Sequence, residues 1–548
     1  MEMTVVNLIG FAALEAAAAF YGFTKLSPSL TGSLTSYFLL FLILNFALHG
    51  VYKMIIYPFF LSPLRHLPQA RGFKPLLGHG LTIFQRPGGQ PHLQMMKDTP
   101  NNGIILTRGF FHTDRLVLTS PEALADVLVY KSYDFEKPAW SRDFLRKFLG
   151  DGLLMTEGDE HKHHRKHIMP AFHFRHIKEL YPVFWAKSVE LCNAVRATLS
   201  NQTSDVLEIG HFSTQVTLDI IGLAGLGRDI NSLRNSDDEL IQNYEEILEP
   251  TSEKAVYFIL HLIFPPWLIQ MLPWKLNKRV KITTGNLKRI CSEFVVEQKS
   301  KMKYEAPDDH ESRDILSIMI RSNNFSDENL ADQLLTFLAA GHETTSSALT
   351  WATYLLSQHP DVQHRLRLEI HKSIPNPAAL SDSTIDVAGL LEGMPYLNGV
   401  CNEVLRLFPT IPVTGRVAIR DTTIAGQFIP NGTVSFVVPW AINRNPALWG
   451  QDSEQFVPER WIDKKTRRAT MDGGADSNYA FLTFLHGPRS CIGERFARAE
   501  LRALLAAFVG GFEMQLADPS EKVIVGGTVT SKPVNGMKLK LKPAPWGP

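Results

Sequence analysis

The chain has 548 residues, 45% of them hydrophobic, and is therefore long enough to bury a large core. Its 56 basic and 55 acidic residues give a net charge of +1, which excludes the strongly basic surface of a nucleic-acid-binding protein, so we expect no nucleic-acid partner. The four cysteines, Cys192, Cys291, Cys401 and Cys491, lie far apart, which argues against a disulfide framework or a cysteine-based zinc site and fits a reducing compartment.

Two apolar stretches begin the chain. Val5–Phe23 contains a central Glu15, and a charged group in the middle of a membrane helix costs about 2.5–3.5 kcal/mol, so this stretch is expected either to span a bilayer or to lie on it. Leu34–Val51 is more uniformly apolar and, with a few further residues, reaches the roughly 20 residues that a crossing needs. We predict that residues 1–57 are a membrane anchor with its main span at about 34–56, rather than a signal peptide or a core helix. The basic residues that follow predict a cytoplasmic position for the rest of the protein.

Residues 58–80 are punctuated by prolines and glycines and are predicted to form a stiff hinge, which leaves residues 81–548 as the folded domain. Gly103–Ser120 alternates between apolar and polar residues, which predicts short strands. Pro121–Tyr130 is predicted to be a helix with proline in its first turn.

A basic, histidine-rich stretch, Gly158–Phe172, has two interpretations. His163 and His167 are four residues apart on a helix, a spacing that occurs in metal sites. No nearby cysteine or well-placed carboxylate completes a tetrahedral ligand set, which favours a solvated basic helix face. Further along, Ala255–Trp274 is apolar, as expected for core packing, and Lys299–Arg313 is charged and predicted to be a loop.

Asp327–Leu356 is predicted to be one buried helix, roughly 45 Å long, with Ser326 as its N-cap. Its middle reads Ala340-Gly341-His342-Glu343-Thr344-Thr345, and a glycine, a carboxylate and two threonines are poor choices for a buried helix. Threonine hydroxyls can bond back to backbone carbonyls and bend the helix, which would leave room for oxygen and water. The alternative is a packing defect rich in threonine, which gives the buried acid no purpose.

Helix patterns also cover Gly399–Phe408, where Glu403 and Arg406 are neighbours on one face, although such pairs are common and carry little information alone. Near the C-terminus, Phe512–Leu516 and Gly536–Lys542 alternate as strands do.

The most informative stretch is Phe484–Gly493, which reads Phe-Leu-His-Gly-Pro-Arg-Ser-Cys-Ile-Gly and precedes a predicted helix at Glu494–Phe508. A cysteine at a helix start lies where the helix dipole favours an anion, so Cys491 is a candidate thiolate and haem iron ligand. The other marked residues suit a flat, acidic ligand: Gly487 and Gly493 allow close approach, Phe484 offers a ring, and Arg489 can bind a carboxylate.

The pattern Phe-x-x-Gly-x-Arg-x-Cys-x-Gly resembles the haem-ligand signature of the cytochrome P450 family. The Ala340–Thr345 stretch is similar to the family's oxygen-activation motif, and the proline-rich Ser62–Pro68 and the residue at His161 look like those of membrane-anchored, fungal biosynthetic members. The resemblance implies a mainly α fold with small β-sheets, the prism-shaped domain of this family, preceded by an N-terminal transmembrane helix.

The resemblance also implies a role for each residue that matches a family motif. Cys491 would bind the iron of haem b (heme), with Phe484, Gly487 and Gly493 around it; Arg165, Arg416 and Arg489 would hold the propionates, with His161 replacing a tryptophan; Glu343 and Thr344 would govern the protonation of dioxygen; Glu403, Arg406 and Arg460 would form a structural triad; and Phe135, Phe337, Ala340, Val413 and Val529 would line the substrate pocket.

As a family member, the protein would be a monooxygenase that oxidises a lipophilic small molecule, with electrons from NADPH delivered by a separate cytochrome P450 reductase or by cytochrome b5. It would lie in the endoplasmic reticulum membrane, with Ala255–Trp274 dipping into the bilayer as an alternative to core packing. Two rival functions are a haem-thiolate isomerase or dehydratase that uses no dioxygen, and a non-enzymatic haem-binding protein. The Glu343–Thr344 pair disfavours both.

Overall fold

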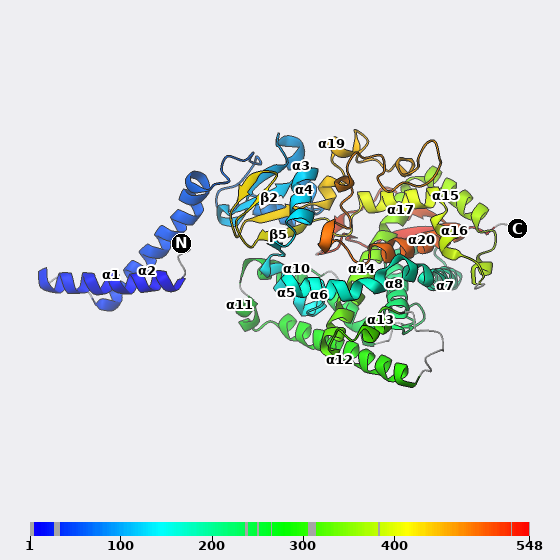
Figure 1. Cartoon of the computed structure of the whole chain (residues 1–548), viewed down its shortest axis with the longest axis horizontal. Helices are drawn as coiled ribbons and strands as arrows, with labels where there is room; N and C mark the ends of the chain where they lie inside the picture. The colour runs from blue at the N-terminus through cyan, green and yellow to red at the C-terminus, as the bar shows by residue number, and fades with distance from the viewer. Residues whose placement is uncertain are drawn as a thin grey trace.

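Two N-terminal helices project from one end of a mainly helical domain (Figure 1). The computed structural model describes residues 5–26, 33–235, 239–248, 251–264, 266–304, 314–381, 384–527 and 529–546. The helices of the domain are α3 (Gln90–Asp98), α4 (Pro121–Ala125), α5 (Ala139–Leu149), α6 (Gly158–Ile168), α7 (Phe174–Asn201), α8 (Ile209–Leu226), α9 (Glu239–Leu248), α10 (Ser252–Ile263), α11 (Pro266–Met271), α12 (Lys275–Tyr304), α13 (Ile315–Ser322), α14 (Asp327–Gln358), α15 (Pro360–Ser373), α16 (Val387–Glu392), α17 (Pro395–Leu407), α18 (Pro439–Ile442), α19 (Pro446–Trp449) and α20 (Glu494–Gly511). This composition confirms the predicted mainly α fold.

In the described part of the chain, the strands form four small sheets. The largest has the order β1-β2-β8-β5-β3, a three-stranded sheet has the order β4-β12-β9, and two hairpins pair β6 with β7 and β10 with β11. The strands are β1 (Ile104–Arg108), β2 (Asp114–Leu118), β3 (Phe135–Glu136), β4 (Val206–Glu208), β5 (Thr414–Ala418), β6 (Thr422–Ile424), β7 (Gln427–Ile429), β8 (Val434–Val437), β9 (Phe512–Leu516), β10 (Val525–Gly526), β11 (Lys532–Pro533) and β12 (Lys538–Pro543). The strands predicted within Gly103–Ser120 and near the C-terminus are therefore present.

The N-terminal helices α1 (Val5–Leu26) and α2 (Leu34–Val51) pack on each other. Ala12 and Ala16 of α1 are buried and, being small and four residues apart, they let the helices approach closely. Asn45 Nδ2 of α2 donates a hydrogen bond to Glu15 Oε2 at 2.8 Å. Among the described residues, two helices, one of them in each of these segments, are long and apolar enough to cross a membrane.

A rigid joint connects α2 to the large sheet. The helix does not end at Val51 but continues as a π-helix, η2 (Tyr52–Leu61). Two side chains beside the sheet hold its carbonyl groups: Arg108 Nη2 donates to the Pro58 oxygen at 2.9 Å, and His112 Nδ1 donates to the Met54 oxygen at 2.7 Å. The anchor is therefore joined to the domain by one buried and one partly buried hydrogen bond.

The buried helix α14 lies in the middle of the domain and packs on α8, α12, α17 and α20. It begins where predicted, because the Ser326 hydroxyl accepts from the Asn329 N–H at 3.1 Å and caps the first turn. Helix α20 packs in turn on α7. These contacts place the α14 motif and the start of α20 in one core.

The apolar stretch Ala255–Trp274 has both a packed and an exposed side. Tyr257 and Ile269 join a small cluster with Phe144 of α5, as expected for core packing. Trp267 and Met271 of α11, by contrast, are 61% and 73% exposed. In Figure 1, α11 lies at the edge of the domain from which the anchor emerges.

The structure corrects the loop predicted at Lys299–Arg313. Helix α12 continues to Tyr304, and the remaining residues of the prediction, up to Arg313, lie outside the described residues. The charges that favoured a loop support the helix instead, since Lys301 forms an ion pair with Glu297 one turn earlier at 2.9 Å.

Candidate functional site

The loop that carries Cys491 is held in place by its own backbone. The Cys491 N–H donates to the Phe484 carbonyl at 2.9 Å, and α20 begins directly afterwards at Glu494. Gly487 has a φ of 76°, and a Cβ atom there would lie 2.1 Å from the Leu128 carbonyl oxygen. Only glycine fits this position, because of the neighbouring backbone rather than because of a ligand.

The Cys491 side chain is exposed, whereas the other three cysteines are buried. Its surroundings still desolvate the thiol and raise its pKa to about 11, although the Gly493 amide and the Arg165 guanidinium act in the opposite direction. Desolvation therefore opposes the thiolate that the helix start favours. A metal cation that binds the sulfur would reverse this, because a coordinating thiol is deprotonated.

Arg165 and His161, both on α6, lie next to this loop. Arg165 donates to the Ser490 carbonyl at 2.7 Å and to the Ser490 hydroxyl at 3.2 Å, one residue before Cys491. His161 is buried, and its Nδ1 lies 3.2 Å from the Tyr133 hydroxyl. Burial, helped by the positive charges of Lys137 and Arg165, lowers the pKa of His161 to about 4. This imidazole is therefore neutral and can act as a hydrogen-bond donor.

The other two predicted propionate ligands are buried cations, and one of them has donor atoms without partners. Arg416 on β5 is 3% exposed, and burial lowers its pKa to about 10. Arg489 forms an ion pair with Glu157, but its Nε and Nη2 are buried without a hydrogen-bond partner among the described residues. Buried donors without partners are rare in native proteins, so these atoms point to a missing acidic ligand.

Sequence reasoning missed Lys137, which the fold adds to the same cluster. Its Nζ lies 3.7 Å from Glu157 Oε1, and burial together with the charges of Arg416 and Arg489 lowers its pKa well below the usual value. Glu157 is thus shared between two cations, which leaves an excess of buried positive charge. The two propionates of haem b would balance this charge, so the residues present fit the group.

Glu403, Arg406 and Arg460 come together as the resemblance implied. Arg406 donates from Nε and Nη2 to the two oxygens of Glu403, each at 2.8 Å, and Arg460 Nε donates to Glu403 Oε1 at 3.0 Å. Trp461 Nε1, which sequence reasoning did not single out, donates to Glu403 Oε2 at 2.8 Å. Glu403 and Arg406 are completely buried, so this carboxylate is an ion whose hydrogen bonds are satisfied.

Asn443 connects this triad to the cysteine loop. Its side-chain amide donates to the Arg406 carbonyl at 3.0 Å and to the Thr483 hydroxyl at 2.9 Å, and its oxygen accepts from the Leu482 N–H at 2.8 Å. Leu482 and Thr483 directly precede Phe484, where the loop begins. Asn443 therefore joins the triad to the loop, and the Thr483 hydroxyl adds a direct hydrogen bond to the Leu405 carbonyl of α17 at 2.7 Å.

The motif in the middle of α14 lies in unbroken helix, not in the bent turn that its threonines predicted. The hydroxyl bonds are nevertheless present, since Thr344 Oγ1 donates to the Ala340 carbonyl at 2.8 Å. Gly341 faces Ile221 of α8, and a Cβ at this glycine would lie 3.0 Å from that side chain. The glycine therefore serves the packing of α8 on α14.

Glu343 points to the hairpin of β10 and β11. Its Oε1 accepts a hydrogen bond from the Thr530 hydroxyl at 2.7 Å and lies 3.2 Å from the Lys532 ammonium. Neither partner was predicted, because nothing in the local pattern links the hairpin to residues nearly two hundred positions earlier.

The residues predicted to line a substrate pocket differ in accessibility. Ala340 is exposed although Ala339 before it is buried, Val529 in the hairpin is 41% exposed, and Val413 is half-buried. Phe337 is nearly buried and packs edge-on against Phe172. Phe135 is completely buried in the core beneath the large sheet, so it offers no surface to a ligand here.

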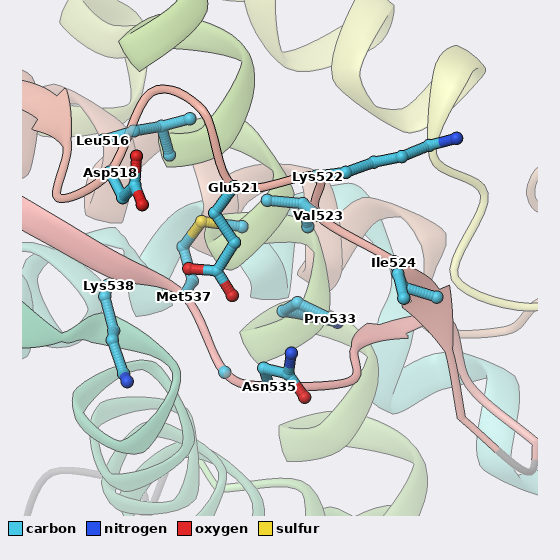
Figure 2. Close-up of a pocket in the computed structure, with 11 residues that line it drawn as sticks. Leu516, Asp518, Glu521, Lys522, Val523, Ile524, Pro533, Asn535, Met537 and Lys538 are labelled. Carbon is cyan, nitrogen blue, oxygen red and sulfur yellow. The ribbon is translucent and has the colours of Figure 1, made fainter.

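A small pocket of about 20 Å³ lies at the base of the same hairpin (Figure 2). Its walls include Leu516, Glu521, Pro533 and Met537. None of the residues that line it belongs to the cysteine loop or to α14, so it is separate from the site.

The histidine-rich stretch gains no support as a metal site. The rings of His163 and His167 lie 4.3 Å apart, and His167 Nδ1 donates to the His163 carbonyl at 2.9 Å. Among the described residues, no group of three or more histidine, cysteine, aspartate or glutamate side chains could hold a metal ion.

Comparison with known proteins agrees with this geometry. A family model described as Cytochrome P450 matches residues 68–540. The chain is 42% identical to cytochrome P450 monooxygenase sphH of Aspergillus fumigatus, over 90% of this chain and 91% of that protein. It is 40% identical to cytochrome P450 monooxygenase FUM15 of Gibberella moniliformis, over 90% and 91% of the two chains. It is also 38% identical to cytochrome P450 monooxygenase ptmK of Penicillium ochrochloron, over 90% and 97%. With matches that extend over most of its length, the chain belongs to the cytochrome P450 family.

Proposed function

We propose that this protein is a haem-thiolate monooxygenase that inserts one atom of dioxygen into a lipophilic small molecule. The observation that carries the proposal is the buried cationic cluster next to Cys491, in which Arg489 has two donor atoms without partners. A thiol beside an uncompensated positive site suits a ligand that has both a metal ion and two carboxylates. Haem b, when bound, supplies the activation of dioxygen.

The remaining roles belong to the side chains of this chain. Cys491 would ligate the iron, with Phe484, Gly487 and Gly493 forming its loop. Arg165, Arg416 and Arg489, with Lys137 and His161, would hold the propionates. Glu343 would take protons from water and pass them to the reaction site, and the Thr344 hydroxyl, turned away from the Ala340 carbonyl, would donate the last hydrogen bond in that path.

Family membership supports a proposal for the redox partners and the class of substrate. NADPH would supply electrons through a separate reductase, with cytochrome b5 as a second donor, and the exposed basic side chains of α6 would face that partner. The named relatives are fungal monooxygenases, which supports a role in the biosynthesis of a fungal secondary metabolite.

For the anchor, we propose that both α1 and α2 cross the endoplasmic reticulum membrane, with the catalytic domain on the cytoplasmic side. The Glu15–Asn45 hydrogen bond supports this, because each group would otherwise be an unpaired polar side chain within lipid. The exposed apolar side chains of α11, at the same end of the domain, would enter the bilayer surface.

The two rival functions make different use of the acid and alcohol on α14. An isomerase or dehydratase without dioxygen chemistry needs no proton delivery at that position, and neither does a haem carrier. The Glu343–Thr344 pair therefore favours the monooxygenase.

The test uses the full chain in yeast microsomes with reductase. The parent is expected to show the thiolate-type absorbance of the reduced carbon monoxide complex, and cells that contain it are expected to gain an oxygenated metabolite. Cys491→Ala should abolish both, whereas Thr344→Ala should keep the absorbance and lose product formed per NADPH consumed. A parent protein without bound haem, or with substrate turnover that consumes no NADPH, would overturn the proposal.

A further inference from the structure

The hairpin of β10 and β11 rests on one face of α14. Glu343, Ser347 and Trp351 are four residues apart, so their side chains lie above one another along the helix. The Ser531 carbonyl accepts from the Ser347 hydroxyl at 2.5 Å and from Trp351 Nε1 at 3.0 Å. The residues on either side of Ser531 contact Glu343, as described above.

Two side chains of the hairpin hold the same oxygen of Glu343. Thr530 and Lys532 are two positions apart, as are residues on one side of an extended strand, and both meet Oε1. The Glu343 side chain is 16% exposed and the Lys532 side chain 26%, so the ion pair lies at the boundary between the core and water. A partly desolvated pair of this kind is stronger than one on the open surface.

The described residues of the hairpin are held from several directions. The Ser531 N–H donates to the Thr410 carbonyl at 2.8 Å, and the Ser531 hydroxyl donates to the Pro409 carbonyl at 3.2 Å. Gly527 has a φ of 101°, and a Cβ atom there would lie 1.8 Å from the Thr530 oxygen. Lys532 therefore reaches Glu343 from a segment that several hydrogen bonds position.

We propose that Lys532 and Thr530 are positioning residues for the catalytic acid Glu343. They hold its carboxylate at the solvent-accessible edge of the site, where it takes a proton from water. The protonated acid no longer attracts the ammonium, so it leaves the pair, gives up its proton at the reaction site, and returns as a carboxylate. Lys532 stays protonated throughout, and each cycle transfers one proton from solvent.

This inference rests on the proposed function and adds a link to substrate binding. Val529, an expected pocket residue, precedes Thr530 directly and is exposed. A molecule that presses on Val529 acts on the same short segment that holds Glu343. Binding of a molecule in the pocket and release of the Glu343 carboxyl group are thereby connected through the consecutive residues 529–532.

The experiment uses the holoenzyme with its reductase and measures the share of NADPH electrons that is lost as hydrogen peroxide. This measurement needs no identified substrate. Lys532→Met is expected to raise this share about two- to fivefold, because a poorly placed acid delivers fewer protons. This is the size of effect expected for one partly exposed ion pair. Lys532→Arg, which keeps the cation, should stay near the parent. Lys522→Met is the matched control, because Lys522 lies on the same C-terminal segment and Figure 2 shows it turned away from the hairpin base.

A second arm tests whether Lys532 acts through Glu343. In a Glu343→Gln background, Lys532→Met should change neither the peroxide share nor the solvent deuterium isotope effect further. In thermal unfolding, the two single substitutions should be non-additive, and this readout does not depend on turnover. The charge-swapped variant Glu343→Lys with Lys532→Glu should recover thermal stability but not the parental peroxide share.

The outcomes separate this inference from the proposed function. If the parent lacks the thiolate-type absorbance or consumes no NADPH, the proposed function fails. If the parent behaves as expected but Lys532→Met matches it, or has equal effects with and without Glu343, the positioning role is wrong and the monooxygenase stands.

Discussion

The imidazole of His92, on α3, is buried against Phe436, with ring centroids 5.7 Å apart. Its Nδ1 has no hydrogen-bond partner in the described part of the chain. Burial, with a smaller contribution from His79, lowers the pKa of His92 from 6.5 to about 4. The folded protein therefore holds this side chain neutral under conditions in which the unfolded chain would protonate it.

This pKa predicts a pH dependence of stability. Because the folded pKa is below the unfolded one, the contribution of His92 is complete above pH 6.5 and is lost as the pH falls towards 4. At pH 5 the loss should be about 2 kcal/mol. Chemical denaturation at pH 7.5 and at pH 5 should show a smaller difference for His92→Phe than for the parent. His364→Gln, at an exposed position on α15, should keep the parental difference; if His92→Phe keeps it too, His92 is not the group that titrates.

At the scale of elements, the link between α17 and the cysteine loop depends on buried ion pairs and should be sensitive to substitution. Removing the charge of Glu403 leaves Arg406 buried without its counter-ion, while Arg460 keeps only its ion pair with Asp452. Glu403→Gln should therefore cost about 3–5 kcal/mol and lower the haem content of the purified protein, since the loop loses its support. The ratio of haem to protein absorbance and the unfolding midpoint measure both effects.

Glu459→Gln provides the control for this prediction. Glu459 pairs with Arg365 in the same region, but both side chains are nearly half exposed. Its loss should cost less than about 1 kcal/mol and leave the haem content unchanged. Equal effects of the two substitutions would show that the Glu403 triad has no special role in holding haem.

Much of the element structure could be predicted, because local patterns carry it. The N-cap at Ser326, the continuous apolar pattern of α14 and the alternation in β9 and β12 all reflect contacts within a few residues. The loop predicted at Lys299–Arg313 was wrong over its first six residues because charge was taken as evidence against a helix. Opposite charges four residues apart form ion pairs that stabilise a helix, as Glu297 and Lys301 do here.

The parts of the site that escaped prediction depend on contacts between distant segments. Lys137 and Glu157 join the cationic cluster only because the segment after β3 folds against the loop before Cys491. In the same way, Trp461 and Asn443 have no periodicity that marks them as partners of the triad. Motif positions could be found from the sequence, but the residues that support them could not.

For the whole molecule, the hydrogen-bonded pair of N-terminal helices predicts the topology. Two crossings would return the chain to its starting side, so the N-terminus should share the cytoplasm with the catalytic domain. An epitope placed before Val5 should be digested by protease in sealed microsomes without detergent. Endoglycosidase should leave the mass unchanged, because the sequons at Asn201, Asn324 and Asn431 would never enter the lumen. Protection of the epitope would indicate a single span, and a glycan would reverse the orientation.

The joint at Arg108 and His112 also decides how the protein can be made soluble. A shortened chain that starts after Leu61, at the beginning of the proline-rich stretch, would lose the Met54 and Pro58 carbonyls that accept from His112 and Arg108. Starting before Tyr52 would keep the last helical turns and their aromatic side chains on the sheet. For expression and crystallisation, the sensible place to cut is therefore within α2, some ten residues earlier than the prolines suggest.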